Sequence, residues 1–286
     1  MPGLAPFYKS VQAHYDLSDD YFRLFLDPSM TYSCAYFERP EMTLAQAQTA
    51  KIDLALGKCD LRPGMTLLDV GCGWGGAMVR AVEKFDVDAI GLTLSRNQRD
   101  YAERVCAQAA GIRKTEVRLQ GWEQFDGRVD RIVSIGAFEH FRRYRYEEFF
   151  RRCHEMLPDD GRMLLHTIIG YQRGTLAERG IEFTREHLRF AIFILREIFP
   201  GGQLPEPDWV TRPAQAAGFE VTAVQSLQPH YARTLDCWAA NLEAHRDEAV
   251  RIADQQTYDK YMRYLTGCAA QFRSGHLDVM QFTLAK

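Results

Sequence analysis

Apolar residues along the middle of the chain follow two alternating periods. Short runs rich in apolar and β-branched residues, typical of buried strands, occupy positions 66–70, 88–92, 117–120, 131–135 and 162–169. Between these runs the apolar residues recur at helical spacing, as in the segment that starts near Ala77 and in residues 144–156. Strands that alternate with helices predict a parallel sheet covered by helices on both faces.

Cap signals predict where several helices begin. Ser18 is a predicted N-cap for a helix whose apolar residues recur at helical spacing as far as residue 26. Thr43 and Gln46 predict a capping box for a helix that runs to Lys58, and Ser95 and Gln98 predict a second box after the second strand. The aromatic segment 31–37 is expected to be a loop or a single extended piece.

The alternation breaks after the fifth strand. Residues 170 to about 207 combine an apolar helix around 188–198 with a loop rich in proline and glycine. An insertion of this kind can cover a site as a lid. Residues 220–227 predict a sixth strand, a long helical region follows from about Leu235, and residues 276–284 predict a seventh strand.

Composition narrows the function classes. The 286-residue chain has a net charge of −3, too small to suggest nucleic acid as a main partner. No apolar run approaches the roughly 20 residues that cross a bilayer, and the first residues lack the layout of a signal peptide. The seven cysteines include no Cys-x-x-Cys pair, which favours free thiols over disulfides or zinc. We therefore expect a cytoplasmic protein without a transmembrane segment, a nucleic-acid partner or a metal.

A glycine-rich turn follows the first strand. Asp69 lies near the end of that strand, and glycines follow at positions 71, 73, 75 and 76. Glycine tolerates positive φ and leaves room for a ligand, and the next helix adds free N–H groups. The spacing fits a dinucleotide fingerprint, and Asp-x-Gly-x-Gly-x-Gly also resembles motif I of class I S-adenosylmethionine methyltransferases. A dinucleotide site typically has an acid at the end of the second strand to bind the ribose, and this chain has Thr93 there. On the glycines alone, both cofactors remain open.

Further motifs decide between them. They are residues 13–18 (AHYDLS), 32–37 (YSCAYF), 121–125 (GWEQF), 135–141 (IGAFEHF), 198–202 (IFPGG), 228–235 (QPHYARTL) and 264–268 (YLTGC). With the glycine turn, they make the chain resemble the mycolic acid cyclopropane synthases and mycolate methyltransferases, within the wider cyclopropane-fatty-acid synthase family. The resemblance spans nearly the whole chain. It implies S-adenosylmethionine as cofactor and transfer of a methyl or methylene group to the double bond of a long acyl chain.

The resemblance also implies a fold and a substrate branch. The expected fold is that of class I methyltransferases, an α/β domain with a seven-stranded, mostly parallel sheet. We expect one domain, with an N-terminal helical cover at 1–64, a cofactor-binding half at 65–169, a lid insertion at 170–219 and a C-terminal half at 220–286. Phospholipid-acting members typically carry an additional N-terminal region, which this chain is expected to lack. That difference favours the mycolate branch, whose unsaturated acyl substrates are presented on an acyl carrier protein.

The resemblance assigns a set of residues to the cofactor. They are Tyr32, Ser33, Asp69, Gly71, Cys72, Gly73, Trp74, Thr93, Leu94, Gln98, Gly121, Trp122, Glu123 and Ile135. Gly71 and Gly73 let the backbone approach the methionine end of the cofactor. By the resemblance, Gln98 binds the ribose, while Trp122 stacks on the adenine and Glu123 accepts from its amino group. Without the motif, Trp122 would be interpreted as a core aromatic and Glu123 as a solvated acid.

The chemistry predicts a second set of residues. Methyl transfer to an alkene leaves a carbocation beside the new methyl group. Aromatic faces such as those of Tyr15, Phe138, Tyr231 and Phe272 are candidates to stabilise the cation, by about 2 kcal/mol or more each where desolvated. A base must then remove a methyl proton to close a ring.

In the resembling enzymes that base is a bound bicarbonate. The positions that hold it match Cys34, Glu139, His166 and Tyr231, together with the backbone near Ile135. Each residue alone also has a structural interpretation: His166 as a core histidine, Cys34 as a small buried hydrophobe. Cys268 lies in a family motif as well, but the mechanism requires no sulfur nucleophile, so a structural role is preferred for it.

The product depends on what the cation meets. Loss of a methyl proton gives a cyclopropane, loss of another proton gives a methyl-branched alkene, and capture of water gives an alcohol. The complete bicarbonate-holding set favours the cyclopropane, with a methyl-branched or hydroxylated mycolate as the alternative. A non-catalytic binder of acyl chains or carrier protein is the alternative from another class. The arginines at 142, 143, 145, 151 and 152 are interpreted as a solvated helix face rather than a carrier-protein dock.

Overall fold

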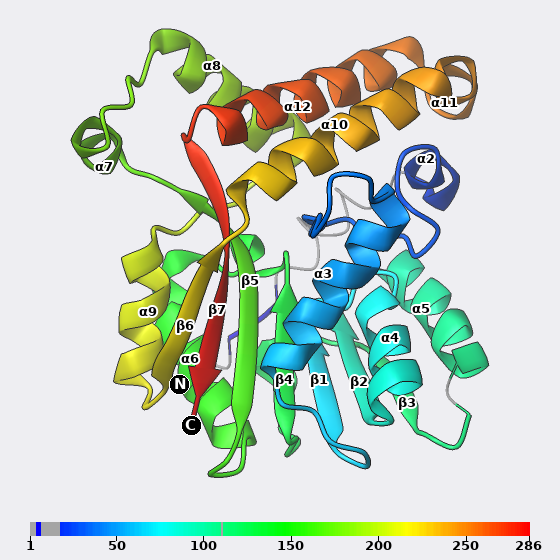
Figure 1. Cartoon of the computed structure of the whole chain (residues 1–286), viewed down its shortest axis with the longest axis vertical. Coiled ribbons are helices and arrows are strands. Elements are labelled where there is room, and N and C mark those ends of the chain that lie inside the picture. The colour runs from blue at the N-terminus through cyan, green and yellow to red at the C-terminus, as the bar shows by residue number, and fades with distance from the viewer. Residues whose placement is uncertain (1–3, 7–17, 110) are drawn as a thin grey trace.

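A computed structural model of the chain describes residues 4–6, 18–109 and 111–286. In this part of the chain seven strands form one sheet in the order β3-β2-β1-β4-β5-β7-β6 (Figure 1). They are β1 (Thr66–Val70), β2 (Asp88–Thr93), β3 (Thr115–Leu119), β4 (Arg131–Ile135), β5 (Arg162–Gly170), β6 (Glu220–Ser226) and β7 (Leu277–Ala285). Only β7 runs antiparallel to its neighbours. The predicted mostly parallel, seven-stranded sheet is confirmed.

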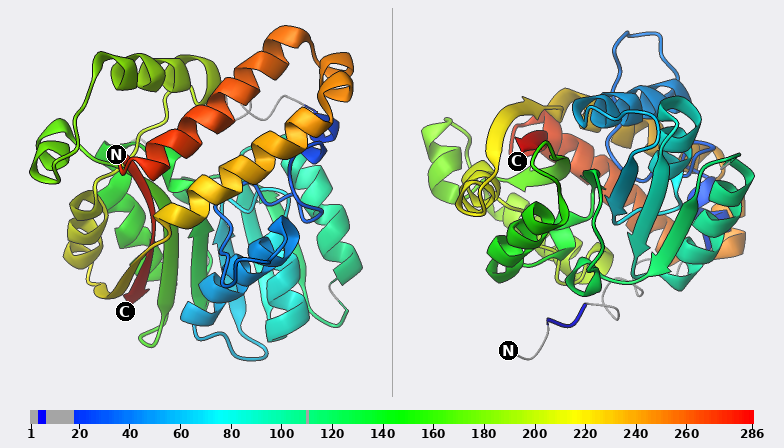
Figure 2. Two further views of the ribbon diagram at one scale, coloured as in Figure 1. Left: turned by 45° about the horizontal axis from the view of Figure 1, so that its top comes forward. Right: turned by 90° about the horizontal axis from the view of Figure 1, so that it is seen from below.

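Helices cover both faces of the sheet (Figure 2). The α-helices of the described residues are α2 (Asp19–Arg23), α3 (Leu44–Lys58), α4 (Gly76–Phe85), α5 (Arg96–Ala109), α6 (Tyr146–Met156), α7 (Arg173–Glu178), α8 (Arg185–Phe193), α9 (Pro207–Ala216), α10 (Gln228–Ala244), α11 (Arg246–Ile252) and α12 (Gln255–Arg273). Apolar residues of α3 and α4 pack with Leu67, Val133 and Leu164 on one face. Those of α6 and α9 pack with residues of the same strands that point to the other face, as the two-residue period of a strand requires.

A third layer lies beyond the carboxyl ends of the parallel strands. Figure 1 shows α8, α10, α11 and α12 gathered there, with α2 beside them. Their core is aromatic: Phe25, Tyr32 and Trp238 lie with ring centroids 5.3–6.2 Å apart. This layer joins residues 21–32 to residues 231–272, so the end of the sheet that carries the glycine turn is covered by segments far apart in sequence.

Most of the predicted caps agree with the structure. The Ser18 side chain accepts from the Tyr21 N–H at the start of α2, and Thr43 with Gln46 forms the full capping box of α3. The second predicted box is only half right. Ser95 accepts from the Gln98 N–H, but the Gln98 side-chain oxygen accepts from the Thr93 hydroxyl at 3.0 Å instead of returning to the Ser95 backbone.

One further boundary differs from that expected, and two helices in the segment 170–219 show details that the sequence pattern did not specify. The long helix α10 begins at Gln228, not near Leu235, because Pro229 is accommodated in its first turn. The apolar helix of the insertion is α8, which continues as a π-helix over Ile194–Ile198. At the end of the predicted insertion, α9 buries Val210 and Ala214 against the sheet and α6, so this helix is part of the ordinary helical layer.

Candidate active site

The glycine turn lies where the strand order reverses. Neighbours of β1 on one side are β2 and β3, and on the other side β4 and β5, so the carboxyl ends of β1 and β4 form the crevice where such sheets bind ligands. Gly71 and Gly73 have φ of +89° and +55°. A Cβ on Gly71 would lie 2.3 Å from the Cβ of Ala137, at the end of β4. The turn therefore requires glycine both for its backbone and for its contact with β4.

One cavity collects every residue predicted to bind the cofactor. Its lining includes Tyr32, Ser33, Asp69, Gly71, Cys72, Gly73, Trp74, Thr93, Leu94, Gln98, Gly121, Trp122, Glu123 and Ile135. These residues come from the loop after α2, from the carboxyl ends of β1 to β4 and from the start of α5. The arrangement offers a glycine-lined end, a buried amide at Gln98 and an indole at Trp122.

Two buried cations at or behind the wall of this cavity were not predicted from the sequence. Arg145 donates to Glu123 Oε1 at 2.8 Å, and both side chains are buried. Burial raises the pKa of Glu123, and Arg145 opposes that rise. Arg145 was expected on a solvated helix face, and that expectation is wrong because its guanidinium turns inward to this ion pair.

The second of these cations is Lys51. Its side chain is almost fully buried in the cavity wall and donates to Ser33 Oγ at 2.8 Å. Burial lowers the pKa of Lys51 to about 8 and raises the pKa of nearby Asp69 to about 7. A signal existed in the sequence: Lys51 follows Ala47 by four residues and precedes Ala55 by four, so it lies on the apolar face of α3.

A larger cavity of about 690 Å³ adjoins the first and shares Tyr32, Ser33, Gly136 and His140 with it. Its lining includes all five residues predicted to be catalytic: Cys34, Glu139, His166, Tyr231 and Cys268. Much of the remaining wall is apolar and comes from α8, α10 and α12, including Phe190, Ile194, Leu235 and Phe272. The shape and chemistry suit a long apolar chain whose reactive part reaches the first cavity.

Glu139 and His166 each bring an unpaired polar atom to this cavity. Glu139 Oε1 accepts from the Ile168 N–H at 2.7 Å, while its Oε2 is buried without a partner among the described residues. His166 Nε2 is likewise buried and lacks a partner in the described part of the chain. Burial raises the pKa of Glu139 and, with Lys51 and Lys58, holds the pKa of His166 well below its usual value. Buried polar atoms without a protein partner require a ligand or an ordered water, and both of these belong to residues of the same cavity.

The aromatic residues expected to stabilise the cation fall into two groups, those that line the larger cavity and one that does not. Tyr231 and Phe272 line the larger cavity with ring centroids 4.6 Å apart. Phe138 lines neither cavity: it is fully buried and stacks on Tyr146 at 4.1 Å. The expectation that Phe138 faces the cation is therefore wrong, since its ring packs in the core. Tyr15 and most of the motif at 13–18 lie outside the described residues.

Three further observations concern the cysteines, possible metal ligands and possible membrane-spanning helices. All seven cysteines lie in the described part of the chain and are free thiols. Among the described residues, no group of His, Cys, Asp and Glu side chains is placed to hold a metal ion. No described helix has both the length and the apolar character to cross a bilayer.

The sheet order, the glycine turn and the cavity beside it define a class I S-adenosylmethionine-dependent methyltransferase. A family model for mycolic acid cyclopropane synthetase matches residues 4–282. Cyclopropane mycolic acid synthase 1 of Mycobacterium tuberculosis is 59% identical over 283 residues, 99% of each chain. From the same organism, the S-adenosylmethionine-dependent methyltransferase UmaA is 57% identical over 286 residues, 100% of each chain.

A solved structure agrees with this. The mycolic acid cyclopropane synthase CmaA1, complexed with SAH and CTAB, superimposes with a TM-score of 0.96 at 59% identity and covers 99% of each chain. The chain belongs to the mycolic acid cyclopropane synthetase family. The predicted family and the predicted enzyme class, an S-adenosylmethionine-dependent C-methyltransferase, are confirmed.

Proposed function

We propose that the enzyme transfers a methyl group from S-adenosylmethionine to the double bond of a long-chain, mycolic-type acyl substrate and closes a cyclopropane ring. The observation that carries this proposal is the pair of connected cavities, one lined by the glycine turn and the other apolar, with Glu139 and His166 at the polar end of the second. The curated relatives named cyclopropane mycolic acid synthases support it.

The first step needs alignment rather than strong chemistry from the protein. The π electrons of the alkene form a bond to the sulfonium methyl, the sulfur–carbon bond breaks, and S-adenosylhomocysteine is released. Holding the two partners in line and out of water supplies most of the acceleration. Gly71 and Gly73 admit the methionine end of the cofactor, and the Lys51 ammonium beside Ser33 favours an anionic carboxylate there.

The second step needs a proton acceptor near the transferred methyl group. The cation forms beside Tyr231 and Phe272, whose faces favour positive charge. One carbon–hydrogen bond of the methyl group then breaks, its electrons close the ring, and the proton leaves. Bicarbonate, when bound, supplies the base for that proton. The side chains fit such an anion: Glu139 Oε2 would accept from its hydroxyl, His166 Nε2 is a second unused polar atom, and Tyr231 and Cys34 line the same cavity.

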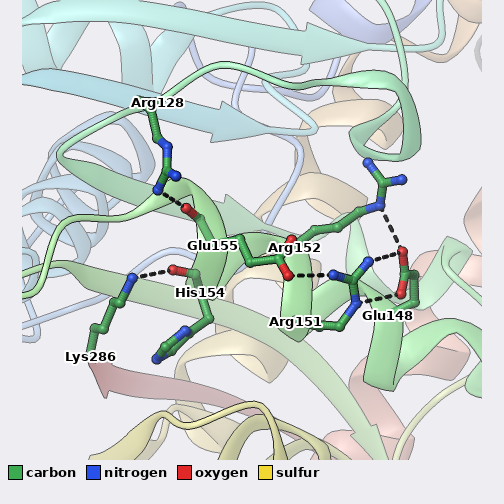
Figure 3. Close-up of polar contacts among 7 residues, drawn as sticks. All are labelled: Arg128, Glu148, Arg151, Arg152, His154, Glu155 and Lys286. Atoms are coloured by element: carbon green, nitrogen blue, oxygen red, sulfur yellow. Dashed lines mark hydrogen bonds and ion pairs between the residues drawn. The ribbon is translucent and has the colours of Figure 1, made fainter.

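Delivery of the acyl chain is a separate part of the proposal. We propose an acyl carrier protein as the donor of the substrate, in the reducing cytoplasm that seven free thiols favour. The exposed arginines of α6 are unsuited to receive it. In Figure 3, Arg151 is held by Glu148 and Glu155, and Arg152 is paired with Glu148. These pairs neutralise the α6 surface, and the expectation of a solvated helix face holds for these two residues.

The test uses S-adenosylmethionine with a fully deuterated methyl group and a carrier-bound unsaturated acyl substrate. We expect S-adenosylhomocysteine to form only when the alkene is present, and mass spectrometry to find two of the three deuteriums in a product with upfield ring protons. Retention of all three would mean that the methyl group never lost a proton, and would favour an alcohol or a branched alkene. No turnover with several such alkenes would favour a non-catalytic acyl-chain binder.

A further inference from the structure

A row of polar side chains crosses the apolar face of the sheet behind the larger cavity. His166 on β5 is paired with Gln281 on β7, and Gln281 is paired with Gln225 on β6. Directly paired residues of antiparallel strands point to the same face, with Cβ atoms about 5 Å apart. His166 and Gln281 are fully buried. Their hydrogen bonds therefore depend on neighbouring side chains, and these determine which ring nitrogen of His166 carries the proton.

Lys58 fixes the orientation of both glutamine side chains. It lies at the carboxyl end of α3, and its Nζ donates to Gln225 Oε1 and to Gln281 Oε1, each at 2.6 Å. An ammonium group can only donate, so the oxygen of each amide must face it. The nitrogen of Gln281 is thereby turned to the opposite side, where it lies 3.3 Å from His166 Nδ1.

The orientation of Gln281 determines the tautomer of His166. An amide nitrogen can only donate, so Nδ1 of the imidazole must accept. The ring is neutral, because burial and the two nearby lysines hold the pKa of His166 well below its usual value. A neutral imidazole that accepts at Nδ1 carries its proton on Nε2. That Nε2–H is the buried donor that lacks a partner among the described residues.

An acceptor belongs to the same cavity. Glu139 is bound through its Oε1 to the backbone N–H of Ile168, two residues along β5 from His166. This hydrogen bond holds the Glu139 carboxylate against the strand that carries His166, and both residues line the larger cavity. The free Oε2 of Glu139 and the Nε2–H of His166 therefore give this cavity one unused acceptor and one unused donor.

We propose that Lys58 and Gln281 are positioning residues that hold His166 in its Nε2–H tautomer, so that it donates to an oxyanion bound beside Glu139. In the other tautomer, Nε2 would present a lone pair to that anion and repel it. The identity of the anion as bicarbonate rests on the proposed function, whereas the tautomer does not. The competing explanation is that the row only satisfies buried polar groups and fixes the strand register.

The tautomer is measured directly by ¹⁵N NMR of enzyme with labelled histidine rings, with the His166 signals assigned from their absence in His166→Gln. We expect one neutral species protonated at Nε2 in the wild type, without added substrate or bicarbonate. Lys58→Met frees the Gln281 amide to rotate, so both tautomers should appear, and kcat should fall by about 10-fold, as when a partner that orients a liganding histidine is lost. The affinity for S-adenosylhomocysteine should not change.

Two further variants separate positioning from packing. Lys58→Arg keeps a donor-only cation and should restore the single tautomer and the rate. Gln225→Met removes the other oxygen from Lys58 but leaves Gln281 in place, so it should match the wild type in both readouts. Protonation at Nδ1 in the wild type, or an unchanged spectrum in a folded Lys58→Met, would overturn the proposal. A rate that does not respond to bicarbonate would instead count against the proposed function and leave the tautomer assignment standing.

Discussion

The two connected cavities are built in opposite ways. The cofactor cavity takes most of its wall from consecutive strand ends, with Asp69 to Trp74 contributing six neighbouring residues. The larger cavity, proposed to hold the acyl chain and called the acyl cavity below, takes its wall from residues between Tyr32 and Leu277. They are spread over the loop after α2, the segment after β4, and β5, α8, α10 and α12. The first is a local motif placed on a sheet, and the second exists only after distant segments have packed.

The two cavities also differ in how they hold charge. In the cofactor cavity buried charges are paired or opposed: Glu123 meets Arg145 at 2.8 Å, and Lys51 lies near Asp69. In the acyl cavity, Glu139 and His166 keep one polar atom each without a partner among the described residues. Unpaired buried polar atoms are costly. In the proposed function, a ligand satisfies these two atoms, so the first cavity binds the cofactor by shape and charge and the second holds the reacting groups.

The largest effect that separates the cavities is expected from Glu139→Gln. The amide oxygen keeps an acceptor for the Ile168 N–H, and the free carboxylate oxygen is replaced by an NH2 group, which can only donate. We expect kcat to fall by about 100-fold or more, within the range of lost acid–base catalysis. The affinity for S-adenosylhomocysteine, measured by calorimetry, should stay within about twofold, since Glu139 does not line the cofactor cavity.

Gln98→Met is the matched control for this variant. Gln98 lines only the cofactor cavity and accepts from Thr93. Its loss should weaken binding of S-adenosylhomocysteine about 10-fold, the equivalent of one good hydrogen bond, with kcat nearly unchanged at saturating cofactor. If Glu139→Gln instead loses cofactor binding and recovers its full rate at saturation, the division between the cavities is wrong.

A smaller effect is expected from Lys51→Met, which should raise the stability of the fold at pH 7 and weaken cofactor binding. The pKa of Lys51 is about 8 in the fold and 10.5 for a free lysine, so burial of the charge costs roughly 3 kcal/mol below pH 8. Between pH 8 and 10.5 the unfolded chain binds more protons, so the stability of the wild type should rise with pH over that window. The variant should have a higher Tm at pH 7 and a flatter rise with pH.

The same variant should bind the cofactor less well. Loss of the ammonium beside Ser33 removes the positive charge that, in the proposed function, favours the anionic carboxylate of the cofactor. We expect the Kd of S-adenosylhomocysteine to rise about 10-fold, and kcat at saturation to stay within about threefold. Ser33→Ala, which keeps the ammonium, is the control. A Lys51→Met enzyme that is less stable at pH 7 and binds the cofactor normally would show that Lys51 has only a structural role.

The difference between the cavities also explains what the sequence could predict. The glycine turn, the strand ends and the cap at Thr43 are set by residues within a few positions of one another, and pattern alone placed them. The start of α10 was expected near Leu235, whereas the helix begins at Gln228 with Pro229 in its first turn, where proline is tolerated. The cavity residues of β5, α10 and α12 came from the family resemblance, since nothing local in Leu164 to Thr167 marks His166 as more than a core residue.

Contacts between side chains far apart in the sequence explain why the roles of other site residues could not be predicted. Arg145 resembled its exposed neighbours in a run of arginines, and only the packing of the segment before α6 against β3's end shows that it pairs with Glu123. Gln281 and Lys58 are 223 positions apart. No pattern in either segment indicates that Lys58 binds Gln281 or that Gln281 contacts His166. Lys51 was the exception, because a lysine on the buried face of α3 is a signal that can be read without the structure.

The smallest effect is expected from Cys268→Ala, which tests whether the acyl cavity needs a nucleophile. Cys268 lies on α12 in the wall of the larger cavity, and burial raises the pKa of its thiol, so the group is neutral at pH 7. Because transfer from a sulfonium to an alkene requires no sulfur nucleophile, we expect kcat to fall by no more than about threefold, mainly through the small space left in the wall. Cys34→Ala should cost more, since Cys34 lies with Glu139 and His166 at the polar end. Intact-mass spectrometry during turnover should find no adduct on the enzyme. A covalent acyl or methyl adduct at Cys268, or a loss as large as that of Glu139→Gln, would show that the acyl cavity performs its chemistry through this thiol.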